Sequence, residues 1–212
     1  MGISDIEQDL KIIRQAIEAS SRYTNITAKG YIFTGIVGML GVYGTYVFLG
    51  GEKVADMNLI TSGEVKILTI LWSLVFVLAV GGVMLFSWSK ARRNNISAWN
   101  SLAARMLLSQ IPLIAVAGVF TIAMGFKGYY PFIPGMWLGI YGVILHSFSY
   151  FTGASHKIEG LLFIVLGSVA VFTPGAITLL LLGVGFGGIH IVSGIVRKLI
   201  RGKGQHESEP VK

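Results

Sequence analysis

Six long apolar stretches set the strongest limit on how this chain can fold. Five of them are close to the ~20 helical residues that cross a bilayer, and the fifth is shorter and relies on its flanking residues. Backbone polar groups in lipid must be satisfied within the segment, so such stretches form helices. The composition, 53% hydrophobic and 13% charged, agrees with a membrane protein. The chain is therefore predicted to be an all-α, six-transmembrane-helix bundle, with spans at Tyr31 to Leu49, Ile67 to Trp88, Met106 to Phe126, Phe132 to Phe151, Leu161 to Thr173 and Ala176 to Val196.

Glycine, proline and polar residues separate these stretches and predict three helical hairpins. "GVMLFSWS" at 82–89 and "GVILHSFS" at 142–149 match at five positions, which suggests that the hairpins are repeats. We therefore predict a transmembrane domain over residues 30–199, built from two-helix repeats at 30–95, 105–152 and 158–199. Residues 200–212 are expected to form a polar cytoplasmic tail.

The distribution of Lys and Arg predicts the orientation, because cytoplasmic loops retain these residues. With both termini inside, the outer loops hold only Lys53, Lys66 and Lys127 of the 17 Lys and Arg residues. The chain is thus expected to lie in the cell (inner) membrane with its N- and C-termini in the cytoplasm. This placement accounts for the net charge of +7 without nucleic acid as a partner.

The first 29 residues predict a cytoplasmic amphipathic helix and a linker. Ser4 and Glu7 have the spacing of a capping box, and an apolar face follows at helical spacing. This face has no early aromatic residue and its polar side is largely acidic, which favours docking onto protein over lipid. The docking face consists of Ile6, Leu10, Ile13 and Ile17. A second short amphipathic segment, Ile96 to Arg105, is expected at the interface before the third span, in which Pro112 is expected to produce a kink.

Small and polar residues form one stripe in the fourth span and another in the sixth. Small residues let helix backbones approach closely in lipid, so both stripes should face other helices. Each stripe contains one histidine, at a similar depth in the inner half of the bilayer. The fourth-span stripe contains Gly135, Gly139, Gly142, His146, Ser149 and Gly153, and the sixth-span stripe contains Ala176, Gly183, Gly187, His190 and Gly194. Ser193 is also expected at a helix-packing position.

Three interpretations of His146 and His190 remain open on sequence alone. Each imidazole could stabilise the bundle through a hydrogen bond to a neighbouring helix. Either could relay protons or bind a ligand, because histidine titrates near physiological pH and ionisable groups in membranes are often functional. Alternatively, the pair could ligate a b-type haem, with Arg92, Arg93 or Arg197 near the propionates.

One segment resembles a known family. "EGLLFIVLGSVAVFTPGAITLLLLGVGFGGIHIVSGIVRKLI", residues 159–200, is similar to the two-helix unit of the HdeD-like acid-resistance membrane proteins. The resemblance implies a small six-helix membrane protein and brings no catalytic residue with it. The positions that carry it are Gly160, Gly167, Pro174, Gly183, Ser193, Gly194, Ile195 and Arg197.

Other chemistry is mostly excluded by the residues themselves. No charged residue falls within a predicted span, and His156 and Glu159 are expected in a solvated inner loop. The chain has no cysteine, and no metal site is predicted. We therefore expect a non-enzymatic membrane protein, surrounded by lipid, that acts as an interaction, stress-related or accessory-subunit module, as a homo-oligomer or within a larger complex. The alternative is a haem-binding or proton-relaying electron-transfer subunit that uses His146 and His190.

Overall fold

A computed structural model describes residues 27–93, 101–152 and 154–206 of the chain, and every regular element in these ranges is a helix. Six helices or helix combinations are long and apolar enough to cross a membrane, as predicted. The N-terminal docking face lies outside the described residues, as does the first part of the expected interfacial segment. The chain is therefore a multi-pass membrane protein by its helix lengths and composition.

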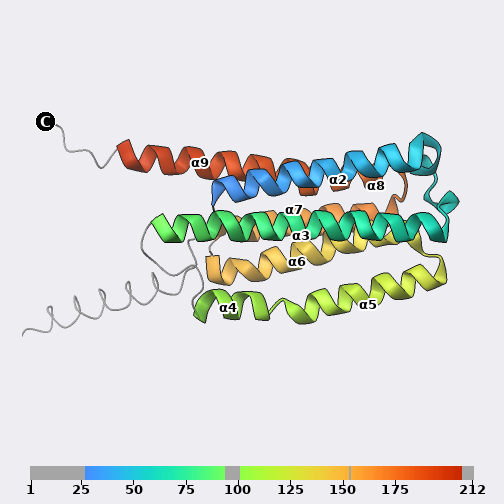
Figure 1. Cartoon of the computed structure of the whole chain (residues 1–212), viewed down its shortest axis with the longest axis horizontal. Helices are drawn as coiled ribbons and strands as arrows, with labels where there is room; N and C mark the ends of the chain where they lie inside the picture. Colours follow the sequence, from blue (N-terminus) through green and yellow to red (C-terminus); the bar gives the residue numbers. More distant parts are fainter. Residues whose placement is uncertain (1–26, 94–100, 153, 207–212) are drawn as a thin grey trace, which may run out of the picture.

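The helices run roughly side by side along the long axis of the molecule (Figure 1). The elements are α2 (Ala28–Ala55), η1 (Met57–Leu59), α3 (Ser62–Arg93), α4 (Ser101–Leu108), α5 (Ile111–Lys127), η2 (Tyr130–Phe132), α6 (Ile133–Thr152), α7 (Ala154–Phe172), α8 (Ala176–Leu182), η3 (Gly183–Ile189) and α9 (His190–His206). The segment η3 is π-helical and joins α8 to α9 in one span. The α2–α3, α5–α6 and α7–α8 connections share one end of the bundle, and α9 finishes at the other, called here the C-terminal end.

Several helix ends follow directly from local sequence. Thr27 caps α2, since its hydroxyl accepts a hydrogen bond from the Gly30 amide at 3.0 Å. Pro112 has no amide hydrogen to donate to the Leu108 carbonyl, and the third span breaks between α4 and α5 just before it. Gly175, with φ 117°, makes the turn between α7 and α8, and a Cβ there would lie 2.7 Å from the Ala55 carbonyl oxygen. Only glycine fits this turn without strain.

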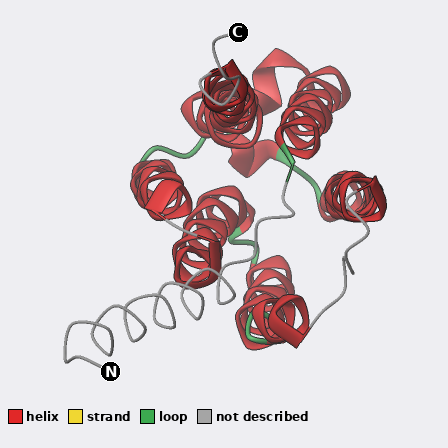
Figure 2. Cartoon of the chain, turned by 90° about the vertical axis from the view of Figure 1, so that its left-hand side faces the viewer, coloured by secondary structure: helices red, strands yellow, loops and turns green. Residues whose placement is uncertain are grey.

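The expected grouping into three hairpins is not confirmed. The most extensive contact between any two described elements joins α6 and α7, which the sequence assigns to different hairpins. Next in extent are the contacts of α2 with α3 and with α9, whereas α5 packs mainly on α6. The view along the bundle in Figure 2 shows the helices end-on.

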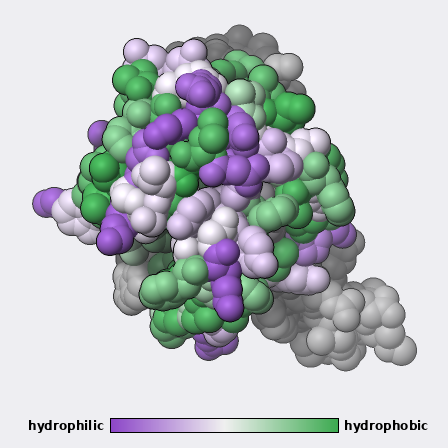
Figure 3. Space-filling model, turned by 90° about the vertical axis from the view of Figure 1, so that its right-hand side faces the viewer, coloured by the Kyte–Doolittle hydropathy of each residue, from purple (hydrophilic) through white to green (hydrophobic). Residues whose placement is uncertain are grey.

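Burial differs strongly among the six spans. In the most apolar part of each span, 6% of α3 and 17% of the α4–α5 span are buried, against 28–33% for the other four. The helices α2, α6, α7 and α8–α9 therefore form the core of the bundle, and α3 and α5 lie outside it. Figure 3 shows the end opposite the C-terminal end, where hydrophilic residues emerge among apolar ones.

Candidate functional site

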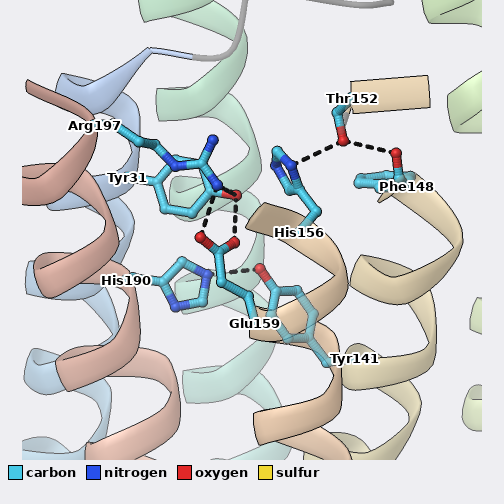
Figure 4. A network of polar contacts seen from close by, with 8 residues as sticks. All are labelled: Tyr31, Tyr141, Phe148, Thr152, His156, Glu159, His190 and Arg197. Carbon is cyan, nitrogen blue, oxygen red and sulfur yellow. Dashed lines mark hydrogen bonds and ion pairs between the residues drawn. The ribbon is translucent and has the colours of Figure 1, made fainter. Parts of the chain in front are cut away.

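Six polar side chains meet inside the C-terminal half of the bundle, and we call them the polar cluster (Figure 4). They come from the four core spans. The members are Tyr31 on α2, Tyr141 on α6, His156 and Glu159 on α7, and His190 and Arg197 on α9.

A largely buried ion pair holds one side of the polar cluster together. The Arg197 guanidinium donates through Nη2 to Glu159 Oε1 at 2.7 Å, and the Tyr31 hydroxyl donates to Glu159 Oε2 at 3.0 Å. The Arg197 guanidinium carbon also lies 4.4 Å from the centre of the Tyr31 ring. The side chains of Arg197 and Glu159 are 18% and 8% exposed. The helices α2, α7 and α9 are thus connected through one carboxylate.

His190 occupies the deeper side of the polar cluster, and both of its ring nitrogens have partners. Nδ1 lies 3.3 Å from the Gly185 carbonyl oxygen, and Nε2 lies 2.7 Å from the Tyr141 hydroxyl. A carbonyl only accepts, so Nδ1 carries the hydrogen and the Tyr141 hydroxyl donates to Nε2. His190 directly follows the π-helical segment η3, a type of segment that is frequent at functional sites.

Aromatic rings enclose the His190 imidazole on several sides. The centres of the Tyr31, Tyr141, Phe163 and Phe186 rings lie 5.4–6.4 Å from the centre of the imidazole. These rings leave little room for water around His190, which is buried. His190 therefore acts as a fully hydrogen-bonded part of the bundle core.

His156 differs from His190 because one of its nitrogens has no partner. Its Nδ1 lies 2.8 Å from the Thr152 hydroxyl, and that hydroxyl donates its only hydrogen to the Phe148 carbonyl oxygen at 2.7 Å. The hydrogen between His156 and Thr152 must therefore belong to Nδ1. The other nitrogen, Nε2, is buried and has no hydrogen-bond partner among the described residues.

The interpretation of His156 and Glu159 as loop residues in water is wrong. They are 2% and 6% exposed, and α7 begins at Ala154, seven residues before the expected start of the fifth span. The expectation that no charged residue lies in a span is wrong for the same reason, because Glu159 lies within α7. Hydropathy along the chain cannot show that Glu159 has a cationic partner 38 residues away.

A signal for the longer helix is nonetheless present in the sequence. His156, Gly160, Phe163, Gly167 and Ala170 recur at helical spacing, and all five are buried. Following this stripe backwards from the apolar run would have placed His156 inside the bundle. It would also have placed Glu159, three residues further along, near the same face.

His146 lies apart from His190. Its ring contacts Tyr150, at 6.3 Å between ring centres, and its Nδ1 is buried without a partner among the described residues. No hydrogen bond or ring contact found for the described residues joins His146 to His190 or to a shared neighbour. Since both nitrogens of His190 are occupied, haem ligation by this pair would require the bonds to Tyr141 or Gly185 to break.

The small residues of the fourth span lie against α7. A Cβ on Gly142 would lie 2.6 Å from the Ile164 amide nitrogen, and one on Gly135 would lie 2.8 Å from that of Val171. Gly139 has open space at its own Cβ position, although Gly167 of α7 approaches its backbone. Ser149 donates to the His146 carbonyl oxygen at 2.6 Å and so stays within its own helix.

The small residues of the sixth span lie against α2. A Cβ on Gly194 would lie 2.9 Å from the Ala28 carbonyl oxygen, and one on Gly187 would meet the Met39 side chain. A Cβ on Gly183 would lie only at ordinary van der Waals distance from side chains of α2. Ser193 is half-buried. The two close helix pairs, α6–α7 and α2–α9, bring the members of the polar cluster together.

The polar cluster is suited to acid–base chemistry. It combines one carboxylate, one guanidinium, two imidazoles and two phenols in an enclosed space. Among the described residues, no three His, Asp or Glu side chains are arranged to hold a metal ion. Its formal charge is balanced when both histidines are neutral, so one added proton changes the charge inside the bundle.

Comparisons with known proteins returned no match for this chain among family models, curated proteins or solved structures. The resemblance to the HdeD-like proteins therefore remains an expectation from the sequence.

Proposed function

We propose that this protein is a non-enzymatic, proton-responsive module of the cell membrane, in which acidification loosens the C-terminal end of the bundle. The observation that supports this proposal is the largely buried Glu159–Arg197 ion pair, which is enclosed with two histidines between the core helices. With both termini in the cytoplasm, the polar cluster would lie in the inner half of the bilayer and respond to cytoplasmic acid.

The cost of burying charges makes a purely structural role for this ion pair less attractive. Moving two charged groups out of water costs about as much as their attraction returns, and apolar replacements are often equally stable. Ionisable residues within membrane helices are therefore functional candidates by default. A stress-related role also agrees with the resemblance to acid-resistance proteins.

The expected response follows from the contacts of Glu159. Its carboxylate is the common partner of Tyr31 and Arg197, so α2, α7 and α9 depend on one charged group. A proton taken up by the cluster leaves it with an excess positive charge in a region of low dielectric constant. Relief of that charge requires a change in the Glu159–Arg197 contact, and this change separates α9 from α7.

A second candidate function, interaction with other proteins in the membrane, is favoured by the low burial of α3 and α5. Their apolar side chains contact either lipid or another subunit. Cross-linking from exposed positions such as Ile70 and Phe120 in native membranes would distinguish the two. A cross-linked homo-oligomer or complex supports the interaction role, and adducts with lipid alone contradict it.

The proton response can be tested by measuring a distance between α7 and α9. Spin labels on cysteines at the exposed positions Ser155 and Lys198 report on the C-terminal end, and the absence of native cysteine keeps the labelling specific. Double electron–electron resonance in liposomes should show a longer or broader distance distribution at pH 5 than at pH 8. The substitution Glu159→Gln should give the acid-type distribution at both pH values.

A matched pair of labels at Glu52 and Ile177 reports on the opposite end of the bundle, where both positions are exposed. Its distance should not change with pH, which would exclude general unfolding. An identical Ser155–Lys198 distance at pH 5 and pH 8 would contradict the proposed function.

A further inference from the structure

We propose that His156 is the residue that takes up the proton, at Nε2, and that Glu159 then exchanges Arg197 for His156 as its charged partner. This inference rests on the proposed function and identifies the residues that carry it out. It follows from the hydrogen bonds of the polar cluster, from helix geometry and from the different burial of protonated His156 and Arg197.

The hydrogen-bond partners single out His156 as the acceptor. Its Nδ1 already donates to Thr152, so its Nε2 offers a lone pair that no described residue binds inside the bundle. His190 has no such position, because its Nε2 accepts from Tyr141. The Glu159 carboxylate already accepts from two donors, Tyr31 and Arg197. Uptake at His156 forms one N–H bond with a proton from water and breaks none of these contacts first.

Glu159 lies within reach of the protonated ring. Residues three apart on a helix have neighbouring side chains, with ~5–6 Å between their Cβ atoms. The ring centre of Tyr31, whose hydroxyl binds Glu159, lies 5.9 Å from that of His156. A rotation of the Glu159 side chain can therefore bring the carboxylate to His156 while α7 stays in place.

Charged or titratable groups face His156 from α2 and α9, but the contacts from α6 are uncharged. Tyr31 faces it from α2, and Arg197 and His190 act on it from α9. From α6 the contact is Thr152, and the backbone of His146 packs against Gly160 one turn further along α7. After proton uptake the single carboxylate thus has two cationic neighbours, His156 and Arg197.

The difference in burial decides which cation keeps the carboxylate. His156 is 2% exposed, whereas the Arg197 side chain is already 18% exposed. A long arginine side chain can extend its charged end to the interface while its stem stays in apolar surroundings. Arg197 Nε is also buried, and no described residue binds it, so part of the guanidinium gains hydrogen bonds when Arg197 leaves. The Glu159 carboxylate therefore pairs with protonated His156, and the charged end of Arg197 moves toward the cytoplasm.

The protonation step can be observed by ¹⁵N nuclear magnetic resonance of histidine-labelled protein in lipid. The chain has four histidines, and single His→Gln variants assign them. At pH 8 the His156 signals should show a neutral ring with hydrogen on Nδ1, and at pH 5 a ring protonated on both nitrogens. His190 should keep the neutral Nδ1–H pattern throughout.

The exchange of partners is tested with His156→Gln in the Ser155–Lys198 distance experiment. This variant should lose the acid-induced change, and the control variant His146→Gln should keep it. A neutral His156 at pH 5, or a His156→Gln protein that still opens, would overturn this inference while leaving the proposed function in place. A wild-type protein with no acid-induced change would instead overturn the proposed function itself. If His156→Gln does not fold, the wild-type spectrum alone decides the protonation step.

Discussion

Replacing Glu159 with glutamine removes the negative partner of Arg197 with almost no change in side-chain size. Removing one member of a fully buried ion pair costs ~3–5 kcal/mol, because the other charge remains buried. Arg197 is 18% exposed, and the glutamine carbonyl can still accept from Tyr31, so the cost should fall near the lower limit. We expect a loss of about 3 kcal/mol, which is roughly a hundredfold change in the folding equilibrium.

Equilibrium unfolding in mixed micelles at pH 8 measures this loss, and a double-mutant cycle assigns it to the pair. The variant Glu159→Gln/Arg197→Gln has no unpaired charge and should lose at least ~1 kcal/mol less than the sum of the single variants. Glu64→Gln, at the more exposed Lys53–Glu64 pair, is the control and should have a smaller effect. Additive single effects, or a Glu159→Gln protein as stable as the wild type, would refute the reasoning.

Three further predictions concern packing, hydrogen bonding and topology. Gly142→Ala places a methyl group 2.6 Å from the backbone of α7 and should cost roughly 1–3 kcal/mol in unfolding free energy. The control Gly118→Ala, with open space around it, should be neutral or stabilising. Equal effects of the two substitutions would contradict the close helix contact. Tyr141→Phe removes the donor to His190 Nε2 and should cost roughly 0.6–1.7 kcal/mol in the same assay, and no loss would argue against this bond. Reporter fusions after Gly128 should be external and fusions at the C-terminus internal, and an external C-terminus would contradict the predicted orientation.

The sequence predicts the class of fold well because hydropathy and glycine spacing are local signals. The six spans and the positions of Gly135 and Gly142 on a face that meets another helix follow from these signals. Which helices pack together does not follow from these signals, because close approach depends on glycines of both helices, such as Gly160 and Gly167 on α7. This dependence explains why α6 packs mainly on α7, whereas the predicted hairpins pair it with α5.

The polar cluster was only partly predictable for a related reason. His190 stood out as a histidine within an apolar helix, and the structure places it at the centre of the aromatic rings. Glu159 and His156 looked like loop residues, because a charged group lowers the local hydropathy whether or not it has a partner. The partner that allows Glu159 to enter the bundle, Arg197, lies in another helix and becomes visible only in three dimensions.

The most direct test of the account is the reactivity of cysteine at position 156 with a membrane-impermeant maleimide in inside-out vesicles. If the first turns of α7 lie inside the bundle, His156→Cys should be labelled far more slowly at pH 8 than Ser155→Cys, whose side chain is exposed one position earlier. If the two cysteines react at the same rate, residues 155 and 156 belong to a solvated loop, and a buried polar cluster at this end of the protein is contradicted.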